Sequence, residues 1–215
     1  MRRRARPSAH AGFASIQKPH TVTIPALCRQ AALWRDAQPG REPVRMSVNL
    51  SARQVARSDV AGCVRRILAT TGLDAGLLDL EITEHAVLAD TDHSAGALRE
   101  LKSLGVRLVL DDFGTGYSSL SHLRRSTIDA LKIDRSFVDG ADRDSDDGAI
   151  IKAVLSMADA LGVDVTAEGV ETSAQLSLLR DHGCPFAQGY LFAAPAPADD
   201  LADMLGLTAT PAAAA

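Results

Sequence analysis

Apolar and polar positions along residues 22–205 alternate in a way that predicts short strands separated by helices. Apolar stretches with strand character lie at 45–50, 77–82, 106–111, 130–133, 163–167 and 185–190. Helical spacing is found at 26–37, 54–70, 94–104, 118–124, 148–161, 174–182 and 198–205. Glycines such as Gly72 and Gly105 follow predicted helices, as is common at helix ends. Strands that alternate with helices predict a single α/β domain with a mostly parallel sheet.

Each predicted strand carries an amide, an acid or an amine near its carboxyl end. In chain order these residues are Asn49, Glu81, the pair Asp111 and Asp112, Lys132, Glu168 and Gln188. In a barrel of parallel strands the carboxyl ends meet on one face, where barrel enzymes place their active sites. A doubly wound sheet would gather ligands only near its crossover point. Polar residues on every strand therefore favour a barrel of parallel strands over a doubly wound sheet.

The composition argues against a protein that binds polymeric nucleic acid and against a membrane protein. The chain has 215 residues, 46% of them hydrophobic, and a net charge of −4, so no basic field suggests binding to polymeric nucleic acid. Three widely spaced cysteines and the lack of a long apolar run predict a cytoplasmic protein without a membrane segment. We expect residues 1–21 to be a disordered or unrelated lead-in and residues 207–215 to be a disordered tail.

The polar residues at the strand ends supply hard oxygen ligands without histidine or cysteine. Such a set selects Mg²⁺, Mn²⁺ or Ca²⁺, and several carboxylates together predict two ions that act on a phosphate. Lys132 would offset phosphate charge, and Glu168 or Gln188 would orient a water molecule. Purely structural interpretations remain open for single residues: Asn49 could cap a helix, and Glu84 and Glu171 could stabilise loops.

Six segments resemble the EAL domain, a family of bacterial cyclic-di-GMP phosphodiesterases. They are SVNLSARQ (47–54), LDLEITE (78–84), VLDDFGTGYSSLSHL (109–123), LKIDRSFV (131–138), TAEGVET (166–172) and AQGYLF (187–192). The resemblance runs in order over residues 22–206, the expected domain. It implies a modified TIM (β/α) barrel that holds two Mg²⁺ or Mn²⁺ ions. It also implies hydrolysis of cyclic di-GMP to linear pGpG in second-messenger signalling, and a homodimer.

The resemblance also implies roles for individual residues. Asn49, Glu81 and Asp111 would hold the first ion, and Asp111, Asp112 and Glu168 the second. Lys132 would hold the attacking water or the phosphate, and Gln188 matches a glutamine of the family's site. Glu84 matches an acid that stabilises the loop carrying Phe113 to Ser119, which often mediates dimerisation in the family.

One departure from the family pattern changes the expected activity. No Glu-Ala-Leu sequence, which names the family, precedes Asn49, and we count six strands where a full barrel has eight. We therefore expect a barrel that is incomplete at its amino terminus, with exposed sheet edges and impaired hydrolysis. The alternative is an inactive module that binds cyclic di-GMP or a protein partner.

Overall fold

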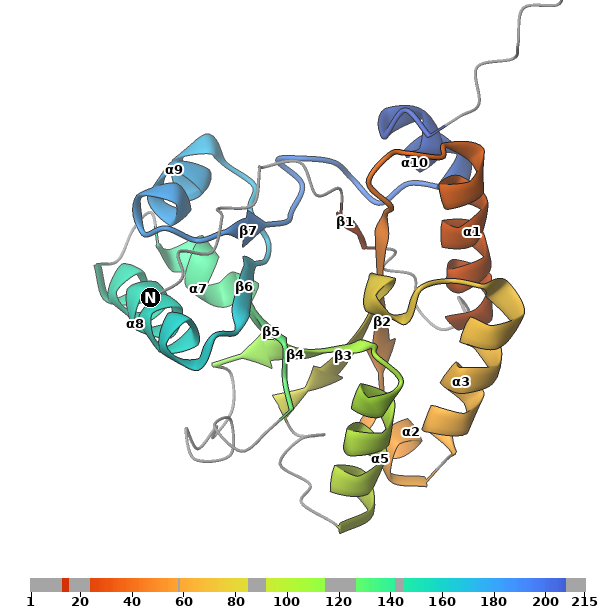
Figure 1. Ribbon diagram of the computed structural model, residues 1–215. Coiled ribbons are helices and arrows are strands. Elements are labelled where there is room, and N and C mark those ends of the chain that lie inside the picture. Colours follow the sequence, from red (N-terminus) through yellow and green to blue (C-terminus); the bar gives the residue numbers. More distant parts are fainter. Residues whose placement is uncertain are drawn as a thin grey trace, which may run out of the picture.

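The computed structural model describes residues 13–15, 24–57, 59–84, 92–114, 127–141 and 145–207. Its seven strands form one parallel sheet in which each strand pairs with the next along the chain. They are β1 (Phe13–Ser15), β2 (Arg45–Leu50), β3 (Leu78–Thr83), β4 (Arg107–Phe113), β5 (Ala130–Ile133), β6 (Asp164–Ala167) and β7 (Phe186–Ala187). The strands curve around a common centre, as in a barrel, with β1 and β7 at the two ends of the sheet (Figure 1). The predicted α/β barrel class is confirmed.

The helices lie outside the curved sheet (Figure 1). They are α1 (Ile24–Ala37), α2 (Ala52–Arg57), α3 (Val60–Thr71), α5 (Asp92–Ser103), α7 (Arg135–Gly140), α8 (Ser145–Leu161), α9 (Ser173–Asp181) and α10 (Ala198–Met204), with the 3₁₀ turn η1 at Ala75–Leu77. None of the helices in these described ranges is both long and apolar enough to cross a bilayer.

Most predicted elements are present within a few residues of their expected bounds, and the exceptions have local causes. The helix expected at 54–70 is two helices, because the Asp59 side chain accepts a hydrogen bond from the Gly62 backbone N–H and begins α3. Helix α7 was not expected; Asp134 caps it by accepting from the Ser136 backbone N–H. The helix expected at 118–124 lies outside the described residues.

The amino-terminal region differs from the expectation. Residues 13–15 lie in the segment expected to be a lead-in, yet they form β1 and pair in parallel with Arg45–Ser47 of β2. Within the described ranges the sheet therefore has seven strands and not the six expected. The segment FAS is too short to show strand periodicity, so the pairing with β2 could not be read from the sequence.

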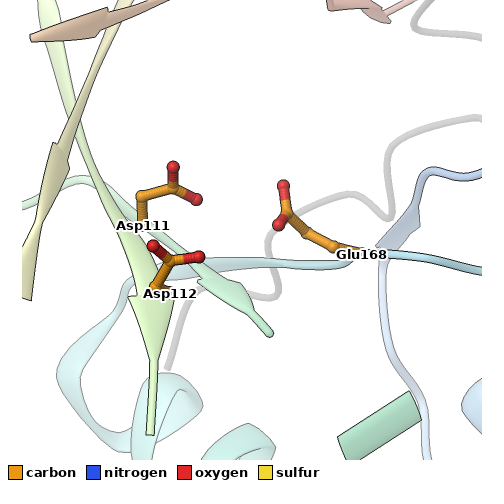
Figure 2. A group of neighbouring side chains, drawn as sticks. All are labelled: Asp111, Asp112 and Glu168. Atoms are coloured by element: carbon orange, nitrogen blue, oxygen red, sulfur yellow. The ribbon is translucent and has the colours of Figure 1, made fainter. Parts of the chain in front are cut away.

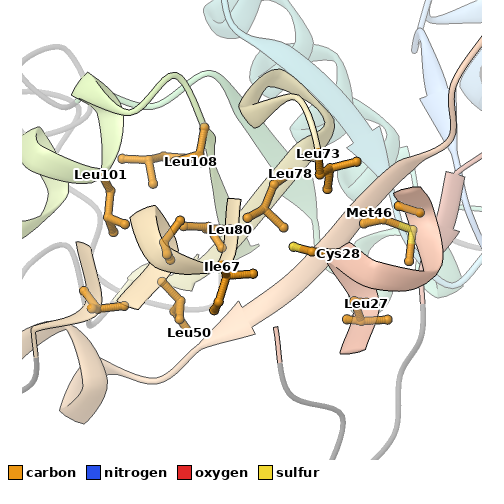
Figure 3. Packing of buried hydrophobic residues seen from close by; sticks show 14 of the residues in the cluster. Leu27, Cys28, Met46, Leu50, Ile67, Leu73, Leu78, Leu80, Leu101 and Leu108 are labelled. Carbon is orange, nitrogen blue, oxygen red and sulfur yellow. The ribbon is translucent and has the colours of Figure 1, made fainter. Parts of the chain in front are cut away.

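The two faces of the strands divide the core from the polar interior. Outward positions such as Leu78 and Leu80 of β3 are fully buried against the helices, where they meet Ile67 of α3 and Leu101 of α5 (Figure 3). A second core cluster forms in the same way between β5, β6 and helices α8 and α9. The alternate positions face inward and are largely polar. Burial of the outer face thus fixes which side chains point into the barrel.

Candidate active site

The tandem acids at the end of β4 both reach the same side of the barrel. Neighbouring residues of a regular strand point to opposite faces. Here the register with β5 shifts between Leu110 and Phe113, and Asp112 has a left-handed φ of 54°. This irregular backbone turns the carboxylates of Asp111 and Asp112 toward Glu168, which follows β6 (Figure 2). One ligand atom from each of the three residues lies within 4.8 Å of the others.

In the described ranges, Lys132 on β5 is the cation that contacts these carboxylates. Its side chain is 6% exposed, and its Nζ lies 2.5 Å from Glu81 Oε1 and 2.8 Å from Glu168 Oε1. Asp111 Oδ1 is more distant, at 3.9 Å. A single ammonium group cannot balance the surrounding carboxylates, so the site keeps excess negative charge.

Asn49 on β2 faces two of these carboxylates. One of the two terminal atoms of its side-chain amide lies 3.3 Å from Glu81 Oε2 and 3.2 Å from Asp111 Oδ2, and this atom is either the nitrogen or the oxygen. As an amide nitrogen this atom donates a hydrogen bond to each carboxylate. As the carbonyl oxygen it adds a third oxygen to the pair, which is the arrangement a divalent cation requires. The alternative interpretation, in which Asn49 caps the following helix, is therefore not needed to explain its position.

Two neutral side chains hold the glutamates. Gln188 Nε2 donates to Glu168 Oε1 at 2.6 Å, and the Ser47 hydroxyl donates to Glu81 Oε1. Gln188 was expected in the site, whereas Ser47 was not singled out from the sequence. The signal was present, since Ser47 lies two positions before Asn49 and therefore on the same face of β2.

Burial shifts the ionisation of these groups. Burial raises the pKa of Asp111 to about 7, with further increases from Glu168, Glu81 and Asp112, although Lys132 lowers it. The pKa of Glu168 is also raised, mainly by burial, against the opposing effect of Lys132. Burial alone would lower the pKa of Lys132, but the neighbouring carboxylates raise it overall, so the lysine stays charged.

Glu84 directly follows β3. Its side chain is buried, and neither carboxylate oxygen has a hydrogen-bond partner among the described residues. The loop that Glu84 is expected to stabilise continues from Phe113 into residues outside the described ranges. Its role in that loop therefore stays a prediction.

A second group of charges lies at the amino end of the strands. Asp79 Oδ1 is 3.3 Å from Arg45 and 3.8 Å from Arg107, and Arg107 also lies 2.7 Å from Asp164. A cavity of about 60 Å³ inside the barrel is lined by residues of both groups, including Arg107 and Lys132. Its volume is sufficient for a few water molecules.

The EAL domain family matches residues 17–195. The chain belongs to this family. It is 45% identical over 166 residues to the cyclic di-GMP phosphodiesterase NbdA of Pseudomonas aeruginosa, an alignment that covers 77% of the chain and 21% of NbdA. It thus spans only about a fifth of the length of that relative.

Solved structures of EAL proteins have the same fold. The MucR phosphodiesterase of Pseudomonas aeruginosa in complex with c-di-GMP has a TM-score of 0.78 and 42% identity, over 82% of this chain and 71% of that one. BlrP1 of Klebsiella pneumoniae, solved with manganese and c-di-GMP, has a TM-score of 0.67 and 32% identity over 74% and 41% of the two chains.

Proposed function

We propose that this EAL domain hydrolyses one phosphodiester bond of cyclic di-GMP, giving linear pGpG. The observation that carries the proposal is the group of carboxylates around Lys132 at the carboxyl end of the barrel strands. The named activity of NbdA and the ligand bound to MucR support the choice of substrate. In this reaction water adds across one P–O bond, so the cyclic dinucleotide becomes a linear one with a terminal phosphate.

The oxygen ligands of the site fit two divalent ions. Asn49, Glu81 and Asp111 would hold the first ion, and Asp111, Asp112 and Glu168 the second. Hard oxygen donors suit Mg²⁺ or Mn²⁺, and the buried Asp111 Oδ1 has no hydrogen-bond partner among the described residues, which leaves it available as a ligand. When bound, such ions stabilise negative charge on the phosphate and lower the pKa of water.

The remaining residues of the site act on the substrate and the water. Lys132 remains charged beside three carboxylates, so it can offset the charge that develops on the phosphate. Gln188 holds Glu168 Oε1 through a hydrogen bond and thereby fixes the orientation of this carboxylate, which would position the attacking water.

The proposal is tested by incubating the chain with cyclic di-GMP and Mg²⁺ or Mn²⁺ and separating the products. We expect pGpG from the wild-type chain, and a loss of roughly 100-fold or more in turnover for Asp111→Asn. Unchanged turnover in that variant would contradict the two-ion site. Tight binding of cyclic di-GMP without product would instead support the inactive binding module.

The homodimer and the cytoplasmic location are also proposals. The loop implicated in dimerisation continues into residues 115–126, which lie outside the described ranges. The homodimer therefore rests on the family resemblance alone. Light scattering on the purified chain at several concentrations tests the dimer, which would have twice the 22.7 kDa mass of the monomer.

A further inference from the structure

Glu81 is held differently at its two carboxylate oxygens. Oε1 accepts a hydrogen bond from the Ser47 hydroxyl and lies 2.5 Å from Lys132 Nζ. Oε2 faces the Asn49 amide at 3.3 Å. The residue is only 2% exposed. One oxygen is therefore occupied within the protein, and the other is turned toward the proposed ion site.

Glu168 has the same arrangement on the other side of Lys132. Its Oε1 accepts from Gln188 Nε2 at 2.6 Å and lies 2.8 Å from the same ammonium group. Each glutamate thus shares one oxygen between Lys132 and a neutral hydrogen-bond donor. Ser47 donates this hydrogen bond to Glu81, and Gln188 donates the corresponding one to Glu168.

Lys132 by itself cannot set the orientation of the two carboxylates. An ammonium group is a compact charge with rotatable donors, and it attracts either oxygen of a carboxylate equally well. A hydroxyl on a strand donates a directional hydrogen bond, so it determines which of the two carboxylate oxygens lies beside Lys132. Ser47 pairs with Asp79 in the parallel register of β2 and β3, which places it one inward position before Glu81.

We propose that Ser47 is a positioning residue for metal binding. Its hydroxyl holds Glu81 Oε1 beside Lys132 and so keeps Oε2 directed at the site shared with Asn49 and Asp111. The proposal rests on the proposed function, because it assigns Ser47 to the metal ligand Glu81 of that same site.

The test measures Mn²⁺ binding to the full chain without substrate, by the loss of the free-ion electron paramagnetic resonance signal. We expect Ser47→Ala to bind Mn²⁺ about 10-fold more weakly, as is typical when the partner of a metal ligand is removed. Ser47→Thr keeps the hydroxyl and should restore most of the affinity. Ser156→Ala is the control, since that hydroxyl donates to the Lys152 carbonyl on the outer helix α8.

Turnover provides a second measurement. In Ser47→Ala the Mn²⁺ concentration that gives half the maximal rate should rise about 10-fold, with most of the saturated rate retained. Thermal unfolding in EDTA separates this effect from general destabilisation. If Ser47→Ala does not fold, Ser47→Cys replaces it, because the thiol has similar size but donates a weaker hydrogen bond.

The outcomes separate the two proposals. A wild-type chain that binds no Mn²⁺ contradicts the proposed function and, with it, the role of Ser47. Wild-type binding that is unchanged in Ser47→Ala or Ser47→Cys overturns the positioning role alone. Weaker binding in Ser47→Ala that Ser47→Thr does not restore also overturns it, because the hydroxyl would then not be the group responsible.

Discussion

The barrel interior contains two groups of charges that are built differently. The amino-end cluster consists of Arg45, Asp79, Arg107 and Asp164, and its two cations match its two anions. The carboxyl-end cluster consists of Glu81, Asp111, Asp112, Lys132 and Glu168, and in the described part of the chain it contains one cation and four carboxylates. Among the residues that the structure describes, the charges of the first cluster balance, whereas those of the second leave an excess of negative charge. This difference distinguishes a structural ion-pair group from a candidate metal site.

Replacement of Lys132 should change the stability of the protein more than any other substitution considered below. Lys132→Met leaves Glu81 and Glu168 as buried carboxylates without their cation, and breaking such a buried pair costs about 3–5 kcal/mol of unfolding free energy. We expect severe destabilisation in EDTA and partial recovery with Mn²⁺, measured by thermal unfolding. The control is Lys152→Met on the exposed face of α8. An equally stable Lys132→Met protein in EDTA would show that the carboxylates need no compensation.

The carboxyl-end cluster also depends on a tight backbone contact after β7. A Cβ at Gly189 would lie 2.3 Å from the backbone N and O of Val170, whose N–H donates to the Gln188 carbonyl. We expect Gly189→Ala to lower the unfolding free energy by about 3 kcal/mol and to weaken Mn²⁺ binding through Gln188 and Glu168. Gly96→Ala on α5 is the matched control, because a Cβ there meets nothing within 4 Å and the φ of Gly96 is not positive. Equal effects of the two changes would contradict this reading.

The excess negative charge should appear as a pH-dependent cost in the metal-free protein. Burial raises the pKa of Asp111 from 3.8 to about 7, so ionisation is less favourable in the folded chain than in the unfolded one. Stability from protonated Asp111 is present below about pH 4 and is lost as the pH rises through about 7.

Asp111→Asn should therefore be more stable than the wild type by about 2 kcal/mol at pH 8 in EDTA, with a smaller difference at pH 5. Mn²⁺ should reverse the order at pH 8 by stabilising only the wild type. Chemical denaturation at both pH values, with and without Mn²⁺, measures this. A wild type that is more stable than the variant at pH 8 without metal would contradict an excess of negative charge.

The smallest effect is expected at the amino-end cluster. Asp164→Asn removes the partner of Arg107 at 2.7 Å, but the Asp164 side chain is half exposed, so the pair is screened by water and salt. We expect a loss of about 0.5 kcal/mol that disappears in concentrated salt, with unchanged Mn²⁺ affinity. A change in Mn²⁺ binding would mean that the two clusters are coupled through the cavity between them.

The sequence contained most of the information about the strands and about the residues at their ends. Its βα alternation predicted the parallel sheet, and acids and amides at the strand ends predicted which residues would meet. Both signals are local, since periodicity and chain position suffice to assign Glu81, Lys132 and Gln188 to inward positions. Asp134 as a helix cap was also a local signal, although it was not used to predict α7.

The tertiary structure decided the features that depend on neighbouring strands. The pairing of residues 13–15 with β2, the turn of Asp112 toward Glu168 and the contact of Ser47 with Glu81 all require a partner distant in the sequence. The charge balance of the two clusters has the same origin. Inward-facing charges are identifiable from alternation, but only the register between strands determines which of them pair and which remain in excess.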